Sequence, residues 1–304
     1  SCCSSERWCG RMAHTHLDLL RGSDGDDLER MLRHVPGMDI RFDGDCAQAG
    51  GLYLPIVAIN LDRRRDRWDT LCKRLSVAGL TKLIRAPAVE GAQLSDDRIT
   101  ALLGVSADRL DQAPRSHLAL TRPAIGCFLS HLAVWRWVLE MNLPRVLVLE
   151  DDAAPAANYD VHRLRSFMTS IPHEMGLVFL GRIIMGGLAE QPFGSPLARL
   201  YYFNGTFAYL ITPAACRVLL RHLLPLRSHI DHQISRVLIE QRRMFPAYYS
   251  EPHFFEPDWS LRSDCYVPLA EDGAADRELE QIILARRRAL LSENRPLLPI
   301  SPAG

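Results

Sequence analysis

The feature that most constrains how this chain folds is the stretch 145–152, in which a run of Val and Leu ends in Glu150, Asp151 and Asp152. A short run of this composition is typical of a strand that is buried on both faces, as in a parallel sheet. Ligands of open α/β sheets bind beyond the carboxyl ends of the strands. In an extended chain Glu150 and Asp152 project to one side and Asp151 to the other. The sequence therefore predicts a functional site at the end of this strand.

Two interpretations of the three acids follow from elementary electrostatics. Neighbouring carboxylates repel one another, and a bound hard cation would hold them ionised. The alternative is a solvated acidic turn that caps the next helix, since acids are common after strands. Taken alone, the stretch supports both interpretations equally.

The bulk composition argues against two classes of protein. The chain has 304 residues, of which 47% are hydrophobic, enough for one large core or two modest ones. The formal net charge is zero, so the composition does not indicate a nucleic-acid partner. No apolar run approaches the length of a membrane span, and the N-terminus lacks a signal-peptide core. We therefore expect a globular protein without a transmembrane segment.

The eight cysteines are scattered and form neither a C-x-x-C pair nor a Cys/His spacing typical of zinc sites. Those in apolar helical contexts are predicted to be buried thiols: Cys72, Cys127 and Cys216. This usage favours a reducing compartment, which predicts a cytoplasmic protein, at most peripheral at a membrane. A lumenal location stays open, because a group near the start would form disulfides there: Cys2, Cys3 and Cys9.

The apolar periodicities predict strands that alternate with helices along one sheet. A strand–helix–strand unit over 54–85 is the start of a Rossmann-like sheet. A long helix with a wide apolar stripe follows at 123–142, and Pro123 is tolerated in its first turn. A lone His on such a helix, here His131, is most often a hydrogen-bonded core residue. The later elements are a helix at 159–169, a strand at 177–180, paired strands at 198–203 and 206–211, helices at 212–224 and 230–241, a strand at 245–249 and a charged helix at 276–291.

The distribution of these elements predicts one catalytic domain. Residues 1–52, with their Ser, Gly and Asp clusters, are expected to form a partly ordered N-terminal extension. Residues 53–268 carry the alternating elements without an internal repeat or a linker. Residues 269–304 are expected to form a C-terminal helix and tail.

Several short motifs, taken in their order along the chain, resemble glycosyltransferase family 25. The likeness covers roughly residues 53–268, and its most specific part is the Gly-Cys-Phe-Leu-Ser-His motif followed by Leu-Glu-Asp-Asp. The motifs span 59–67, 88–91, 125–131, 147–152, 179–182, 205–212 and 230–231. The family includes lipopolysaccharide glycosyltransferases and the galactosyltransferase domains of collagen-modifying enzymes.

The resemblance implies a GT-A-like fold, with a mixed, mostly parallel Rossmann-type sheet flanked by helices. It also implies an inverting hexosyltransferase that moves galactose or glucose from a UDP-sugar to a hydroxyl of a glycan or a glycosylated acceptor. The expected cofactor is Mn²⁺ or Mg²⁺, held where such enzymes carry an Asp-x-Asp motif. Asp152 is the expected direct ligand, and Glu150 is expected to ligate with it or to lie behind it.

Donor contacts are expected from residues that follow the first strands or lie in the matched motifs. Asn60 and Asp62 would bind the base or ribose, and Arg67 a phosphate. Glu90 departs from the Asp-Gly that the family usually shows. The full set of expected donor-binding residues is Asn60, Asp62, Arg67, Glu90, Gly91, Arg122, Ser130, His131, Asp151, Gly205 and Thr206.

Inversion needs a general base for the acceptor hydroxyl, and the family pattern assigns this role to Asp231. The Glu that usually follows this Asp is His232 here, which leaves a neighbour open as the base. The structural alternative for Asp231 is an acid in the first turn of a helix. His253 is a secondary metal candidate outside the expected ligand set.

Three other functions compete with this prediction. The first is a catalytically impaired homologue that binds a sugar nucleotide or serves as a scaffold. The second, a metal-dependent phosphohydrolase, needs a glycine-rich phosphate loop or a second carboxylate cluster, and the sequence shows neither. The third is a retaining transferase, which the stereochemistry of the product would reveal.

Overall fold

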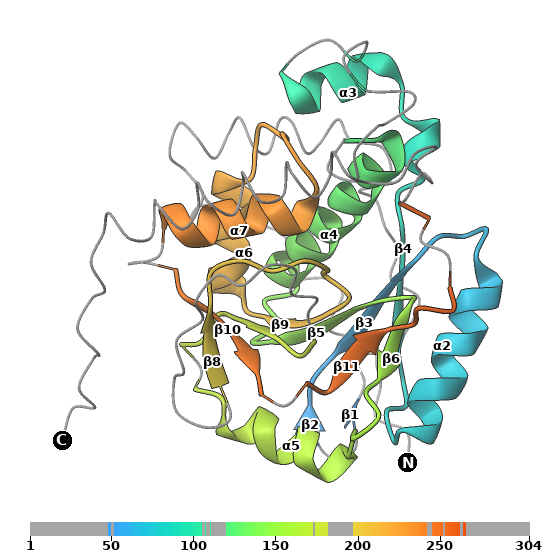
Figure 1. The fold of residues 1–304 in the computed structure, drawn as a ribbon, viewed down its shortest axis with the longest axis vertical. Helices are drawn as coiled ribbons and strands as arrows, with labels where there is room; N and C mark the ends of the chain where they lie inside the picture. The colour runs from blue at the N-terminus through green and yellow to red at the C-terminus, as the bar shows by residue number, and fades with distance from the viewer. Residues whose placement is uncertain are drawn as a thin grey trace, which may run out of the picture.

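A computed structural model describes residues 48–49, 52–104, 107, 110, 120–172, 174–181, 197–241, 245–251, 253–261 and 264–265 (Figure 1). Its elements in chain order are β1 (Gln48–Ala49), β2 (Leu52–Tyr53), β3 (Ile56–Asn60), α2 (Arg65–Val77), β4 (Ile84–Pro87), the 3₁₀ turn η3 (Gly91–Gln93), α3 (Asp96–Leu103), α4 (Arg122–Glu140), β5 (Val146–Glu150), β6 (Ala153–Pro155), α5 (Val161–Ser170), β7 (Leu177–Phe179), β8 (Leu197–Leu200), β9 (Ala208–Ile211), α6 (Pro213–His222), α7 (Ile230–Glu240), β10 (Ala247–Ser250) and β11 (Phe255–Pro257).

A seven-stranded sheet, in the order β4-β3-β5-β9-β7-β10-β8, forms the centre of the fold. Strands β4, β3 and β5 pair in parallel, and so do β7 and β10. Strand β9 runs antiparallel to both β5 and β7, and β8 runs antiparallel to β10. Five of these seven strands therefore point in one direction. The expected mixed, mostly parallel sheet flanked by helices is confirmed.

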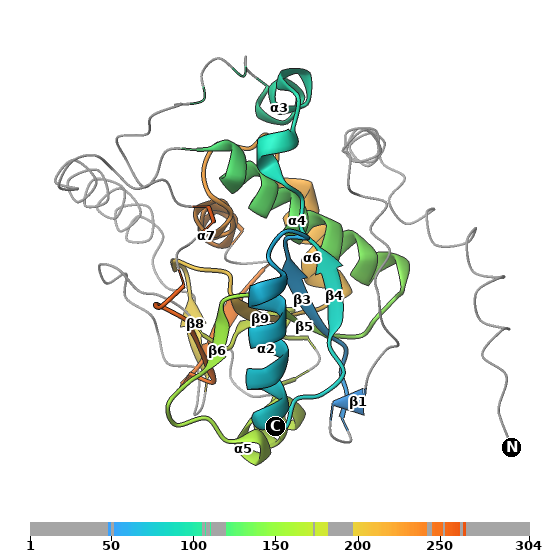
Figure 2. The ribbon, with the colours of Figure 1, turned by 90° about the vertical axis from the view of Figure 1, so that its right-hand side faces the viewer.

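Helices cover both faces of the sheet, so the fold has three layers (Figures 1 and 2). Helices α4, α6 and α7 pack on one face, and α2 and α5 pack on the other. Strand β5 serves both layers because successive side chains point to opposite faces. Its Val146 and Val148 join the α4 layer, whereas Leu147 and Leu149 join the α2 layer. The same alternation directs Glu150 toward α4 and Asp151 toward α2.

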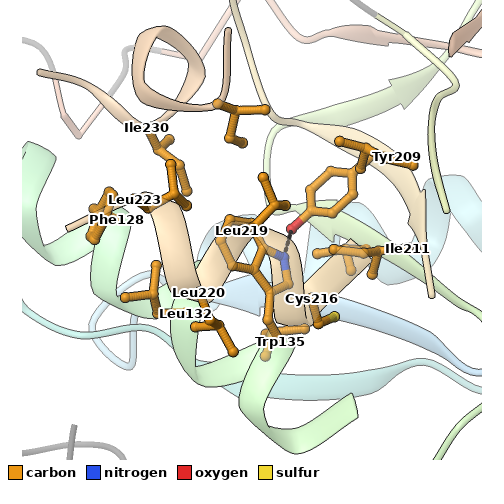
Figure 3. Packing of buried hydrophobic residues seen from close by; sticks show 14 of the residues in the cluster. Phe128, Leu132, Trp135, Tyr209, Ile211, Cys216, Leu219, Leu220, Leu223 and Ile230 are labelled. Carbon is orange, nitrogen blue, oxygen red and sulfur yellow. Dashed lines mark hydrogen bonds between the residues drawn. The ribbon is translucent and has the colours of Figure 1, made fainter. Parts of the chain in front are cut away.

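Helix α4 is largely buried, as its wide apolar stripe predicts. The Oγ1 atom of Thr121 accepts a hydrogen bond from the backbone N–H of Ala124 and caps the helix, with Pro123 in the first turn. Trp135 is fully buried against α6, and its Nε1–H donates to the Tyr209 hydroxyl at 2.8 Å (Figure 3). This bond ties the helix to β9 in the middle of the sheet.

The expected hairpin around Asn204 and Gly205 is wrong. Strand β8 pairs with β10, whereas β9 lies between β5 and β7. The two segments are close in sequence but belong to different parts of the sheet. Gly205 instead turns the chain, with a φ of 85° that favours glycine. Periodicity also does not predict the antiparallel pairing of β6 with β11. This pairing places the segment after β11 next to the acidic end of β5, where the Asp258 N–H donates to the Asp152 carbonyl oxygen.

Several expectations concern residues outside those described: most of the extension 1–52, the helix 276–291 and the tail. The division into 1–52, 53–268 and 269–304 therefore stays a prediction. Among the described helices, none has the length and apolar character needed to cross a bilayer.

Gly91 is expected to be required for packing, whatever its role in binding. A Cβ atom on Gly91 would lie 1.9 Å from the backbone carbonyl oxygen of Arg122, at the start of α4. Backbone atoms cannot rotate away, so Gly91→Ala should lower the free energy of unfolding by about 3 kcal/mol in denaturant titrations. The matched control is Gly104→Ala, where the nearest atom is 4.0 Å away and only the positive φ costs energy, about 1 kcal/mol. Equal losses in the two variants would contradict this explanation.

Candidate active site

An open pocket lies at the carboxyl ends of β3 and β5, where the sequence places its acids. It is bounded by the first turns of α2 and α4 and by the segment after β11. The lining residues are Ile59, Asn60, Leu61, Arg63, Arg67, Ala88, Val89, Glu90, Pro123, Cys127, Ser130, His131, Glu150, Asp151, Asp152, Asp264 and Cys265. The two predicted metal residues therefore line one cavity, together with Asp151 and five other predicted donor-binding residues: Asn60, Arg67, Glu90, Ser130 and His131.

Glu150 faces α4 and is held by two side chains. Its Oε1 atom lies 3.1 Å from Nε2 of His131 and accepts a 2.5 Å hydrogen bond from the Thr206 hydroxyl. Burial acts to raise the pKa of Glu150, but the hydrogen bonds and the nearby His131 hold it below its usual value. Glu150 is therefore a fixed, ionised carboxylate. The predicted residues His131 and Thr206 contact this acid directly.

His131 has no exposed surface and connects the acid to the core. Its Nδ1 atom lies 2.8 Å from the Tyr209 hydroxyl, which accepts the Trp135 N–H at the same distance. Because that hydroxyl oxygen already accepts a hydrogen bond from the Trp135 Nε1–H, its own O–H can donate to Nδ1. With Nδ1 accepting from Tyr209, a neutral imidazole carries its proton on Nε2, which lies 3.1 Å from Oε1 of Glu150. The interpretation of His131 as a hydrogen-bonded core residue is correct, and the same residue also lines the pocket.

Asp151 points the other way, toward α2. Its Oδ1 atom pairs with Arg67 Nη1 at 2.8 Å, and its Oδ2 atom accepts a 2.7 Å hydrogen bond from the Asn60 amide. Burial raises the pKa of Asp151, and its bonds to Asn60 and Arg67 oppose that rise. Both carboxylate oxygens are engaged, so Asp151 joins the strand end to α2 and β3. Asn60 and Arg67, predicted as donor contacts, serve this joint in the structure.

Asp152 has the environment of a cation ligand. Its Oδ1 atom is buried and accepts no hydrogen bond from the residues that the structure describes. Burial, with added repulsion from Glu150 and Asp151, raises the pKa of Asp152 to about 7. A carboxylate that is destabilised in this way gains from a bound cation. The side chains present therefore fit the oxygen-ligated Mn²⁺ or Mg²⁺ that the sequence predicts, with Asp152 as the main ligand.

Asp264 is a pocket residue that the sequence pattern did not single out. It forms ion pairs with Arg63 at 3.2 Å, Arg64 at 2.6 Å and Arg67 at 3.4 Å. These pairs link the segment after β11 to the first turns of α2. The residues are about 200 positions apart, so periodicity carried no signal for the contact. The next residue, Cys265, also lines the pocket.

The remaining predicted donor contacts divide between the pocket and its surroundings. Glu90 and Ser130 line it, and Glu90 pairs with Arg63 at 2.7 Å. Asp62 is not among the lining residues and pairs with Arg85 at 2.7 Å. Arg122 is likewise outside the lining set, and its guanidinium contacts Asp96 and the Leu94 carbonyl. Donor binding by Asp62 and Arg122 stays a prediction, and Gly91 is explained by its packing.

Asp231 lies in the first turn of α7 and is connected to Glu150 through the backbone of Gly205 and the side chain of Thr206. Its Oδ2 atom accepts a 3.0 Å hydrogen bond from the Gly205 N–H, and its Oδ1 atom accepts one from the His232 N–H at 2.8 Å. Gly205 precedes Thr206, which contacts Glu150. Asp231 is not among the lining residues, but its charge acts on both Glu150 and Cys127. Its role as the base stays a prediction.

Cys127 differs from the expectation of a plain buried thiol. It is half-buried and lines the pocket, where its Sγ atom lies within 4.8 Å of ligand atoms of His131 and Glu150. The signal for this arrangement was present in the sequence, since Cys127 and His131 are four residues apart on one helix. Helical spacing alone does not predict the cluster, because its third member, Glu150, comes from strand β5.

Comparisons with known proteins point to one family. Residues 54–171 match the family described as "Glycosyltransferase family 25 (LPS biosynthesis protein)". A "Glycosyltransferase 25 family member" of Anopheles gambiae is 39% identical over 292 residues, which cover 88% of this chain and 46% of that protein. The human "Procollagen galactosyltransferase 2" is 34% identical over 132 residues, 42% of this chain and 20% of that protein. The human "Inactive glycosyltransferase 25 family member 3" is 33% identical over 180 residues, 56% of this chain and 30% of that protein. The chain spans less than half the length of these curated relatives.

Proposed function

The chain belongs to glycosyltransferase family 25 through residues 54–171, and from this premise we propose that it is an inverting, metal-dependent hexosyltransferase. The donor would be a UDP-sugar, with galactose or glucose as the hexose, and the acceptor a hydroxyl of a glycan or a glycosylated chain. The relative named as a procollagen galactosyltransferase supports galactose. The single observation that carries the proposal is the buried oxygen of Asp152, which accepts no hydrogen bond from any described residue and lies in a pocket at the carboxyl edge of the sheet.

The acids at the end of β5 would hold the cation of this reaction. Asp152 would ligate it, with Glu150 as the second candidate. When bound, Mn²⁺ or Mg²⁺ neutralises charge on a departing diphosphate as a Lewis acid. The protein prepares Glu150 for this role through its bonds to His131 and Thr206, which keep the carboxylate ionised and immobile. Asp151 contributes by fixing the strand end against α2.

Arg63 is the basic residue best placed to reach the diphosphate. Its side chain lines the pocket yet keeps 51% of its surface exposed, whereas Arg67 is 4% exposed and committed to Asp151. Arg63 pairs with Glu90 and Asp264 in the structure, and a guanidinium can exchange such partners for phosphate oxygens. We therefore assign the phosphate contact, which the sequence pattern suggested for Arg67, to Arg63.

The direct test is a donor screen on the full chain. The protein is incubated with UDP-galactose, UDP-glucose and other sugar nucleotides in the presence of Mn²⁺, and release of UDP is measured. We expect release with one UDP-hexose, its loss in EDTA and its recovery on adding Mn²⁺. The anomeric configuration of any transferred sugar then distinguishes inversion from retention. Equal release with and without EDTA would contradict the proposal.

Asp231→Asn tests the assignment of the general base. Asn keeps the size of the side chain and an oxygen that can accept the Gly205 N–H, but it cannot take a proton at neutral pH. We expect kcat to fall by about 100-fold, the lower end for general-base catalysis, with the affinity for UDP unchanged. The affinity is measured by calorimetry and kcat by UDP release. A near-normal rate would move the base to another residue.

A second candidate function is supported by a human relative named "Inactive glycosyltransferase 25 family member 3" and by a cattle relative named "Probable inactive glycosyltransferase 25 family member 3". In that case the chain would bind a sugar nucleotide without turning it over. Calorimetry separates the two functions, because binding of UDP with no release from any donor would favour the inactive homologue. The departures Glu90 and His232 are the residues to restore to Asp and Glu in a test for regained activity.

A further inference from the structure

A thiol, an imidazole and a carboxylate converge at the wall of the pocket. Cys127 and His131 are four residues apart on α4, which places both on one face of the helix. Glu150 meets them from the end of β5. The Cys127 Sγ atom, a ring nitrogen of His131 and a carboxylate oxygen of Glu150 all lie within 4.8 Å of one another. All three residues line the pocket, and Glu150 keeps 24% of its side-chain surface exposed, although His131 has none.

We propose that Cys127, His131 and Glu150 form a binding site for a thiophilic divalent cation of the zinc class, beside the oxygen site at Asp152. Sulfur and nitrogen ligands suit Zn²⁺, whereas Mn²⁺ and Mg²⁺ prefer oxygen. At zinc bond lengths, tetrahedral ligand atoms are about 3.3–3.8 Å apart, so side-chain shifts of about 1 Å close the site. Three protein ligands leave the fourth coordination position facing the pocket.

The surroundings of His131 suit it as a ligand. Metal-binding imidazoles are usually oriented by a hydrogen bond at their other nitrogen, and the Tyr209 hydroxyl supplies this bond at Nδ1. On binding, Nε2 takes the cation while the imidazole keeps one proton on Nδ1, which donates to the Tyr209 oxygen. The Cys127 thiol releases its proton to solvent. One cation thus enters and one proton leaves, and no oxidant or reductant takes part.

Occupation of this site would oppose the function proposed above, and this part of the inference rests on that function. Glu150 belongs to both sets of proposed metal ligands, because it neighbours Asp152 and contacts His131. A zinc-class cation would draw Glu150 toward α4 and place two positive charges beside the oxygen site. Both effects weaken Mn²⁺ binding at Asp152. The site is therefore expected to inhibit the enzyme when such a cation is present.

Cobalt spectroscopy tests for ligation by the thiolate. The 304-residue chain is reduced, stripped of metal and titrated with Co²⁺, and its Zn²⁺ affinity is measured against a chromophoric chelator. We expect a thiolate-to-cobalt charge-transfer band that Zn²⁺ abolishes. In Cys127→Ser the intensity of this band should fall by the amount that one bound Co²⁺ contributes. The Zn²⁺ affinity of that one site should fall by about 100-fold or more. Cys2, Cys3 and Cys9 are retained in both proteins, so the difference isolates Cys127.

Cys265→Ser is the matched control, because this second thiol lies within hydrogen-bond reach of Cys127 but outside the three-ligand cluster. It should keep both the band and the affinity. Protection of Cys127 from alkylation by Zn²⁺, read by mass spectrometry on the wild-type protein, gives a measurement that needs no variant. An identical Co²⁺ spectrum in Cys127→Ser, or alkylation of Cys127 at the same rate with and without Zn²⁺, would overturn the site.

The expected weakening of Mn²⁺ binding by Zn²⁺ is measured by electron paramagnetic resonance of free Mn²⁺, which needs no enzymatic turnover. One equivalent of Zn²⁺ should release bound Mn²⁺ from the wild-type protein and leave it bound in Cys127→Ser. If the donor screen fails while the cobalt band appears, the zinc-class site stands and the proposed transfer falls. Mn²⁺ that stays bound when Zn²⁺ is added would contradict the inhibitory role.

Discussion

Asp152→Asn is expected to lower Mn²⁺-supported hexosyl transfer by about 1,000-fold, the equivalent of about 4 kcal/mol of transition-state stabilisation. Asn preserves the shape of the side chain but removes its charge. The charge matters because this is the acid whose Oδ1 atom is buried and accepts no hydrogen bond from any described residue. The measurement is kcat over a range of Mn²⁺ concentrations. Added Mn²⁺ should raise the Tm of the wild-type protein but not that of the variant.

Without metal, the substitution Asp152→Asn should stabilise the fold, and this gain in stability should grow as pH rises. The pKa of Asp152 is about 7 in the fold and about 3.9 in an unfolded chain. Between these values the folded state holds the proton that the unfolded state has lost, so the contribution of Asp152 to stability is lost as pH rises from 4 to 7. Asp152→Asn has no such charge to bury. Without metal, it should therefore be more stable than the wild-type protein above pH 7, with the gap closing toward pH 4.

The control for both measurements is Asp97→Asn, which removes an exposed acid on α3 outside the pocket. It should leave transfer, the Mn²⁺ response and the pH profile as in the wild-type protein. Full activity of Asp152→Asn in EDTA would remove the cation from the mechanism. A metal-free variant that is less stable than the wild-type protein at pH 8 would contradict the account of Asp152 as a strained acid.

The parts of the site that the sequence predicted are those that depend on local geometry. Alternation along β5 correctly separates Glu150, which contacts His131 on α4, from Asp151, which contacts Arg67 on α2. The buried strand and the long apolar helix were likewise visible in short windows. Their meeting at the carboxyl edge follows from the topology of a parallel sheet. One general rule thus brought residues about 90 positions apart into one predicted site.

The parts that sequence reasoning missed depend on long-range pairing. Adjacent strand-like segments around Asn204 suggested a hairpin, but β8 finds its partner in β10 and β9 inserts between β5 and β7. The pairing of Asp264 with three arginines of the α2 region has no local signature. Asp151 is predicted as a donor contact from its place in the motif, whereas its burial beside Arg67 is a tertiary property that has no local signature. Such contacts are decided by packing, which a single sequence does not display.

Arg67→Met is expected to lower the free energy of unfolding at pH 7 by about 3–5 kcal/mol, the usual cost of removing one partner of a buried ion pair. Arg67 and Asp151 are 4% and 10% exposed, with 2.8 Å between Nη1 and Oδ1. Met occupies much of the same volume but leaves Asp151 charged among Glu150 and Asp152. The loss should shrink as pH falls toward 4, because protonation relieves the stranded carboxylate. Urea titrations at several pH values measure it.

A double-mutant cycle with Asp151→Asn separates the ion pair from the packing of Met. If the stranded charge is the cause, Arg67→Met combined with Asp151→Asn should recover most of the loss, since no buried charge remains unmatched. Arg136→Met is the matched control, because Arg136 and Glu140 form an exposed pair at 2.7 Å on α4, worth about 0.3–0.5 kcal/mol. A loss in Arg67→Met no larger than in Arg136→Met would mean that Asp151 is already protonated in the fold. In that case Asp151 would connect the end of β5 to α2 as a neutral acid, and the acids at the end of β5 would carry one more proton at pH 7.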